Sequence, residues 1–141
     1  METDKEPGLQ FIFAAKVLLG SPMDLGMTTY AKRRISPING GSFEGDLLKG
    51  IIIPGGADWQ TIRLNGTVDV EARYTLQTDD GTSIYLQDKG MRCETESGIY
   101  MRTSAVFEVQ GDRYNWLSQA LFIGCGKKMA DHVFVKFYKV L

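Results

Sequence analysis

The chain has 141 residues, of which 43% are hydrophobic and 23% are charged, and its formal net charge is −1. This balance is typical of one globular domain that is long enough to bury a core. Acidic and basic residues are interspersed, and the longest basic run is Lys32–Arg34. Nucleic-acid binding needs a concentrated basic face, so we expect no nucleic-acid partner.

The beginning of the chain is polar and contains Pro7 and Gly8. This composition predicts a disordered tail over residues 1–8 and a single domain over residues 9–141. The apolar segment Phe11–Gly20 contains Lys16 and is far shorter than the ~20 apolar residues of a membrane helix. The residues before it are more acidic than basic, unlike an export signal. We therefore expect a cytoplasmic protein with no membrane contact.

Short apolar segments separated by turn residues make up the rest of the chain. They predict strands at about residues 9–19, 27–36, 42–53, 57–64, 67–78, 82–87, 99–109, 119–126 and 131–141. The strand over 67–78 is the clearest, because its apolar and polar residues alternate without a fault. Turns are predicted at Leu64–Gly66, Asp79–Gly81 and Gln110–Asp112, and only Arg113–Ala120 has a helical pattern.

This pattern predicts an all-β fold, either a barrel or a sandwich. Long strands joined in sequence favour an antiparallel closed β-barrel with at most one short helix. Closure removes the edge strands that an open sheet must protect. A barrel of this size is filled by side chains or holds one small ligand.

The segment Ile51–Gln60 joins a buried-type strand to Pro54 and two glycines. We interpret it as a strand end and a sharp corner of the barrel. The corner does not explain why Asp58 stands beside Trp59. Asp58 is expected either to cap the turn or to lie at the mouth of a pocket.

Residues that hold metals and cofactors are sparse. The chain contains Cys93, Cys125 and a single histidine, His132. Both cysteines are expected to be free thiols in a reducing compartment, and His132 is expected to begin the last strand. These residues do not supply the four ligands of a closed zinc site, and no phosphate-binding loop precedes a helix. We expect no metal and no cofactor.

Two interpretations of the strand over 67–78 remain open. Its apolar residues can face a filled core while Glu71 and Arg73 face water, or its polar residues can line a cavity. In the strand over 99–109, Tyr100 and Arg102 share one face. A phenol beside a guanidinium group suits the binding of an anion or a carbonyl group.

The chain resembles a family of bacterial and fungal proteins, the domain of unknown function 3237 family, also known as uncharacterised protein family 0311. The resemblance extends from about Phe11 to the end and rests on Arg33–Gln60, Glu71–Gly90, Tyr100–Leu117 and Leu121–Lys128, with the motifs PGGADWQ, ARYTLQTDDG and RYNWL. It implies a calycin-like or lipocalin-like barrel, often a homodimer, without an agreed activity. This chain departs from the family in its short segment Met91–Ile99, in Glu71 where Asp is usual, and in Met101 where Phe is usual.

The resemblance directs attention to the polar and aromatic residues inside these motifs. The predicted ligand-binding residues are Asp58, Trp59, Glu71, Arg73, Tyr100, Arg102 and Trp116. Carboxylates, guanidinium groups and aromatic rings together suit a small oxygenated ligand. If the protein is an enzyme, Asp58 or Glu71 is the candidate general base, and an arginine holds the enolate or carboxylate oxygen.

Three functions follow as hypotheses. The first is a barrel that binds a small oxygenated molecule, such as an aromatic acid or a ketone, in its interior. The second is a cofactor-free isomerase, cyclase or lyase that works by carboxylate acid–base catalysis. The third is a structural or interaction domain with a packed core.

Overall fold

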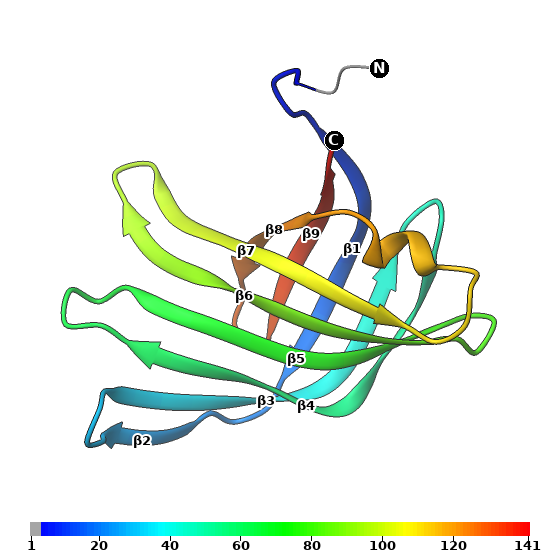
Figure 1. The fold of residues 1–141 in the computed structure, drawn as a ribbon. Coiled ribbons are helices and arrows are strands. Elements are labelled where there is room, and N and C mark those ends of the chain that lie inside the picture. Colours follow the sequence, from blue (N-terminus) through cyan, green and yellow to red (C-terminus); the bar gives the residue numbers. More distant parts are fainter. Residues whose placement is uncertain (1–3) are drawn as a thin grey trace.

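A computed structural model describes residues 4–141, and the first three residues of the predicted tail lie outside this part. Nine strands form one antiparallel sheet in the order β1-β9-β8-β7-β6-β5-β4-β3-β2 (Figure 1). The elements are β1 (Leu9–Leu19), β2 (Met23–Met27), β3 (Lys32–Glu44), β4 (Lys49–Ile62), β5 (Val68–Thr78), β6 (Ser83–Thr95), β7 (Gly98–Val109), the 3-10 turn η1 (Asn115–Ser118), β8 (Phe122–Lys128) and β9 (His132–Val140).

The sheet closes because β1 also pairs with β3. Residues 14–19 of β1 pair antiparallel with residues 38–44 of β3. The short strand β2 pairs with the first part of β3 and lies outside the ring of the other eight strands. The predicted closed antiparallel barrel with one short helical turn is confirmed.

The predicted strand break at Pro54 is wrong, because β4 runs from Lys49 to Ile62 as a single strand. Ile53 pairs with Thr75 and Ala57 pairs with Arg73, so three residues of β4 stand opposite a single residue of β5. Proline has no N–H to donate to a strand ladder, and a bulge accommodates it without ending the strand. Residues 32–44, likewise predicted as parts of two strands, form the single bulged strand β3.

The predicted hairpin turns lie where the sequence places them. Gly81 N donates to Thr78 O at 2.9 Å, and Gly66 N donates to Arg63 O at 3.0 Å. Gly66 has a φ of 90° and Gly81 a φ of 87°, values that favour glycine. These turns fix which residues of the neighbouring strands face one another.

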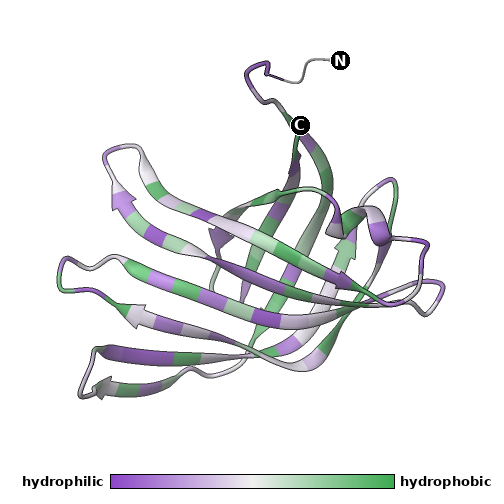
Figure 2. Ribbon diagram, in the orientation of Figure 1, coloured by the Kyte–Doolittle hydropathy of each residue, from purple (hydrophilic) through white to green (hydrophobic). Residues whose placement is uncertain are grey.

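The barrel interior is divided into an apolar half and a polar half. Along the strands, hydrophobic and hydrophilic residues alternate (Figure 2), because successive side chains point to opposite faces. In the apolar half, the ring of Phe13 contacts the rings of Phe43, Phe107 and Phe137 at centroid distances of 5.5, 5.9 and 4.8 Å. This aromatic cluster is the centre of the core.

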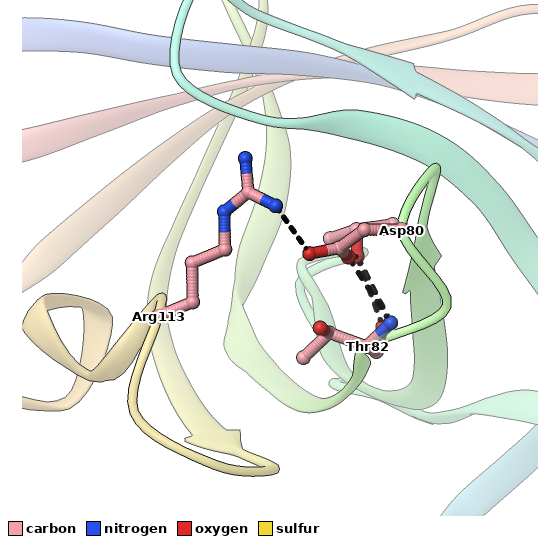
Figure 3. A network of polar contacts seen from close by, with 4 residues as sticks. Asp80, Thr82 and Arg113 are labelled. Atoms are coloured by element: carbon pink, nitrogen blue, oxygen red, sulfur yellow. Dashed lines mark hydrogen bonds and ion pairs between the residues drawn. The ribbon is translucent and has the colours of Figure 1, made fainter.

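The segment around η1 covers one end of the barrel, which we call the plugged end. Tyr114 and Leu117 are buried there, and Trp116 is partly buried against the core. Arg113 Nη1 donates to Asp80 Oδ2 at 2.6 Å, which ties this segment to the β5–β6 turn (Figure 3). Hydrogen bonds from Thr78, Thr82 and Arg113 hold the pKa of Asp80 at about 2, below its usual value.

The opposite end is the mouth of the barrel, where the β2–β3, β4–β5 and β6–β7 hairpins lie (Figure 1). Within residues 4–141, none of the helical structure is long and apolar enough to cross a membrane. Residues 4–8 precede β1, and Gly8 O accepts a hydrogen bond from Leu141 N at 2.9 Å.

Replacement of Phe13 by Ala tests the aromatic cluster. Phe13 is 0% exposed, so Phe13→Ala is expected to lower the free energy of unfolding by about 3–5 kcal/mol through lost contacts and a cavity. Phe11 is 48% exposed and serves as the control, with an expected loss of about 1 kcal/mol or less. Denaturant unfolding measures both values, and equal losses would contradict the assignment.

Candidate functional site

The polar half of the interior contains two carboxyl groups that face each other across a small residue. Asp58 of β4 pairs with Ala72 of β5, and Ala72 pairs with Asp88 of β6. The three residues therefore form one row across neighbouring strands with their side chains on the same face. The methyl group of Ala72 leaves space above it for both carboxyl groups.

Asp88 is the more deeply buried acid of the pair. It is 5% exposed, and burial raises the pKa of its carboxyl from 3.8 to about 7, with the charge of Asp58 contributing to the rise. The nearby hydroxyl group of Thr103 opposes this rise in the pKa of Asp88. In the described residues, however, that hydroxyl group has no hydrogen-bond partner. A substantial fraction of Asp88 therefore still carries a proton near neutral pH and can donate it.

Asp58 is partly buried and, unlike Asp88, accepts hydrogen bonds from identified partners. Its Oδ2 accepts from Gln60 Nε2 at 2.8 Å, and its Oδ1 accepts from the backbone N of Glu71 at 3.0 Å. Burial raises the pKa of Asp58, while these two hydrogen bonds and the charges of Arg92 and Arg34 oppose the rise. Because its environment stabilises the charged form better than that of Asp88, Asp58 is the better proton acceptor.

Two neutral hydroxyl groups complete the polar surface. Tyr74 is 3% exposed and Thr103 is 8% exposed. Burial, together with the nearby Asp88 and Asp58, raises the pKa of Tyr74 well above its usual value. Tyr74 Oη, Thr103 Oγ1 and Asp88 Oδ1 are buried without a hydrogen-bond partner among the described residues. Unpartnered buried polar atoms are costly, and three of them together indicate a site for a polar group.

These polar groups line a cavity of about 30 Å³ together with apolar side chains that include Leu19, Val70 and Met101. A cavity of this size has room for about one water-sized group. Two glycines of β8, the strand next to β7, leave room for the side chains of Thr103 and Met101: a Cβ at Gly124 would lie 2.2 Å from Thr103 Oγ1, and one at Gly126 would lie 2.6 Å from Met101 Sδ.

The structure does not bring the seven predicted site residues together. Asp58 faces the interior, but Trp59, Glu71 and Arg73 lie on the outer face, where the Arg73 guanidinium group stands over the Trp59 ring at 4.4 Å. Glu71 Oε1 accepts from Gln87 Nε2 at 3.3 Å on that face. The physical reason is alternation along a strand: Trp59 must point away from the interior because Asp58 points into it.

The other predicted residues also lie away from the cavity. Tyr100 and Arg102 are exposed on the outer face of β7, and the Arg102 guanidinium group lies 5.3 Å from the Tyr100 ring centroid. Trp116 belongs to η1 at the plugged end. The predicted arginine–tyrosine contact therefore exists, but it is separate from the interior.

Sequence reasoning missed Asp88, Tyr74 and Thr103. The signal for Asp88 was its position in β6, where it follows Ile84 and Leu86 on the inward face. A carboxylate in an otherwise apolar row is a stronger indication of a site than one in a polar row. Arg34, Gln60 and Arg92 were also missed, for another reason. Only the register of the strand pairs shows that these residues lie on the inner face.

Among residues 4–141, no group of three or more His, Cys, Asp or Glu side chains is placed to hold a metal ion. Cys93 and Cys125 are free thiols, as predicted. They lie on opposite sides of β7, opposite Tyr100 and Arg102 respectively. The ionisable and hydroxyl groups that line the cavity belong to Asp58, Asp88, Tyr74 and Thr103.

Comparison with known proteins gives matches over the whole barrel. The profile of the family described as "Protein of unknown function (DUF3237)" matches residues 7–140. A "UPF0311 protein" of Rhodopseudomonas palustris is 34% identical over 146 residues, covering 94% of this chain and 95% of that protein. The crystal structure of a β-barrel-like protein of Acinetobacter baumannii superposes with a TM-score of 0.94 at 32% identity and covers 100% of both chains.

A more distant relative carries the name of an activity. The "Hydroalkoxylation enzyme" of Penicillium herquei is 25% identical over 134 residues, covering 95% of this chain and 84% of that enzyme.

The pH dependence of stability tests the burial of Asp88. The folded protein keeps a proton on Asp88 up to about pH 7, whereas the unfolded chain loses it near pH 4. The folded state therefore binds more protons between these values, and stability falls as the pH rises through them. Between about pH 5 and about pH 8, the wild type is expected to lose roughly 2–3 kcal/mol more than Asp88→Asn.

Urea unfolding at both pH values measures this difference. Glu108→Gln, which removes an exposed carboxylate from the outer face of β7, is the control and should keep the pH dependence of the wild type. An identical pH dependence in the wild type and Asp88→Asn would show that Asp88 is already ionised in the folded protein at low pH.

Proposed function

This chain belongs to the DUF3237 family, whose name assigns no activity, and we propose that its barrel binds a small oxygenated molecule and catalyses proton transfer on it. Asp88 acts as the general acid and Asp58 as the general base. This proposal combines the first two functions suggested by the sequence. It assigns the base to Asp58 and not to Glu71, because Glu71 lies on the outer face.

The observation that carries the proposal is a pair of interior carboxyl groups with different environments. Asp88 has no hydrogen bond to its Oδ1, and burial raises its pKa to about 7. Asp58 accepts two hydrogen bonds and lies near two arginines. Titratable groups whose environments separate their pKa values supply an acid and a base at the same pH. Core packing alone does not account for three unpartnered polar atoms around one cavity.

The reaction class that fits best is the addition of a hydroxyl group to a carbon–carbon double bond. Asp88 gives its proton to one alkene carbon, and the hydroxyl oxygen bonds to the other carbon while Asp58 accepts the hydroxyl proton. The π bond, the O–H bond of Asp88 and the O–H bond of the substrate hydroxyl break, and a C–H bond, a C–O bond and an O–H bond on Asp58 form. Proton exchange with solvent then returns a proton to Asp88 and removes the proton from Asp58. The name of the Penicillium herquei relative, a hydroalkoxylation enzyme, supports this class.

The size of the cavity limits how a substrate reaches these groups. Its volume of about 30 Å³ admits only the reacting group, so the rest of the molecule lies toward the mouth. The hydroxyl group of Tyr74 and the thioether of Met101 line the same cavity. Tyr74 remains a neutral donor, because burial raises its pKa, and can orient a substrate oxygen.

Cyclisation of ortho-prenylphenol to the corresponding dimethylchroman tests the proposal. Protonation of this alkene gives a tertiary cation that the phenol oxygen captures, so the probe needs only an acid and a base. Asp88→Asn is expected to lower the rate at least about 100-fold, as for the loss of a general acid, and Glu108→Gln should leave it unchanged. Product is measured by chromatography, with incorporation of solvent deuterium as the signature of protonation.

An equal rate in Asp88→Asn and the wild type would overturn the role of Asp88. The ε-methyl NMR signal of Met101, the methionine that lines the cavity, reports whether the probe binds inside. Met23, Met27, Met91 and Met129 are exposed and provide reference signals. A probe that shifts the Met101 signal but is left unchanged would identify a binding protein and not an enzyme.

A further inference from the structure

Two arginines occupy inward positions on the mouth side of the carboxyl pair. Arg34 of β3 pairs with Gln60, which is buried. Arg92 of β6 pairs with Val68 and Met101, and both of these partners are buried. Since paired residues share a face of the sheet, both guanidinium groups belong to the inner side of the barrel.

Arg34 is connected to Asp58 through one intermediate side chain. Arg34 Nε donates to Gln60 Oε1 at 2.8 Å, and Gln60 Nε2 donates to Asp58 Oδ2 at 2.8 Å. This series of two hydrogen bonds uses only the Nε donor of Arg34. The two terminal nitrogens of the guanidinium group remain available to donate to a ligand. A guanidinium group has five N–H donors, so Arg34 retains most of its capacity to bind an anion.

The side chain of Arg92 makes no hydrogen bond and no ion pair within residues 4–141. Its guanidinium group is partly buried, and burial together with the charge of Arg34 lowers its pKa, while Asp58 opposes this effect. Two cations that repel each other in a partly buried site are costly unless an anion lies between them.

The acidic residues near the mouth supply only part of this negative charge. Asp58 offsets one of the two positive charges at a distance, but it forms no ion pair with either arginine within the described residues and accepts its hydrogen bonds from Gln60 and from the backbone of Glu71. Asp24, which pairs with Arg34, accepts from Gly26 N at 2.8 Å and forms no ion pair with either arginine within the described residues. Glu94 follows Arg92 on the inner side and is exposed near the β6–β7 turn.

We propose that Arg34 and Arg92 bind the negatively charged oxygen group of the substrate, which is therefore an organic anion such as a carboxylate. This inference rests on the proposed function, because it takes the cavity at Asp58 and Asp88 as the place of reaction. The anion lies at the mouth between the two guanidinium groups, and the uncharged reacting group extends from it toward Asp88. Guanidinium groups favour carboxylates because their paired N–H donors match two oxygens.

Such an arrangement also explains the order of groups along the interior. An anion held by the arginines screens their mutual repulsion and offsets the cost of their burial. The negative charge of the substrate stays at the arginines, away from Asp88. Only the uncharged reacting group of the substrate therefore lies next to the protonated carboxyl of Asp88. The arginines thus select the substrate, and the carboxyl groups act on it.

Binding of benzoate and of benzamide, a neutral molecule of the same shape, tests the inference. The ε-methyl NMR signal of Met101 reports binding inside the barrel. Arg34→Met and Arg92→Met are each expected to weaken benzoate binding by about 10-fold or more, as for the loss of a charged hydrogen bond. Arg33→Met is the matched control, because Arg33 is exposed and its Nη1 donates to Thr61 Oγ1 at 2.9 Å on the outer face.

In the wild type, benzoate should bind more tightly than benzamide, and the two arginine variants should remove that preference. Thermal unfolding checks that each variant is folded. Arg92→Met should be at least as stable as the wild type because a repulsion is removed, whereas Arg34→Met also loses the hydrogen bond to the buried Gln60 and is expected to be less stable. Three results would overturn the inference: no Met101 shift with benzoate, equal affinity for the two probes, or equal weakening by Arg33→Met.

Asp88→Asn separates this inference from the proposed function. Its effect on ortho-prenylphenol turnover tests the proposed function alone, since Asp88 is not part of the anion site. If the arginine variants weaken benzoate while Asp88→Asn leaves ortho-prenylphenol turnover unchanged, the proposed function fails and the anion site stands. If turnover depends on Asp88 while benzoate binding is independent of both arginines, the anion site fails alone.

Discussion

The antiparallel pairing of β1 with β3 is the constraint on which the rest of the molecule depends, because it turns an open sheet into a barrel. The two strands approach so closely at Gly41 that an added Cβ would lie 1.9 Å from Lys16 O, and Gly41 has a φ of 139°. Only glycine tolerates both conditions. Closure gives every strand an inner and an outer face, and it is this division that separates the carboxyl pair from water.

The two halves of the interior have opposite energetic roles. The aromatic cluster around Phe13 buries large apolar surfaces and stabilises the barrel. The half around Asp58 and Asp88 costs stability, because carboxyl groups and hydroxyl groups lose their hydration there. Asp88 limits this cost by staying protonated. Apolar side chains could fill this region without that loss of stability. Buried ionisable groups that are retained at such a cost are typical of functional sites.

Alternation along the chain predicted most of the strands, the turns and the closure, as the strand over 67–78 illustrates, but it divided β3 and β4 at their bulges. It could not say which parity faces inward, because that depends on how the strands close in three dimensions. The choice of Glu71 and Arg73 followed the more polar parity, whereas the site lies on the more apolar one with Tyr74. The electrostatic interaction of Arg34 with Arg92 could not be predicted either, since they are 58 positions apart and lie on strands that are not neighbours in the sheet.

The bulge at Pro54, Gly55 and Gly56 explains why Asp58 lies where it does. Before the bulge, Ile52 pairs with Leu76, and continued pairing in that register would place Asp58 opposite Val70. The extra residues move the register by two positions, so Asp58 pairs with Ala72 and keeps its inward direction. Ala72 is also the partner of Asp88. The irregular stretch is therefore more than a bend: it moves one carboxyl group into the row of the other, and Trp59 is carried to the outer face as a consequence of the same alternation.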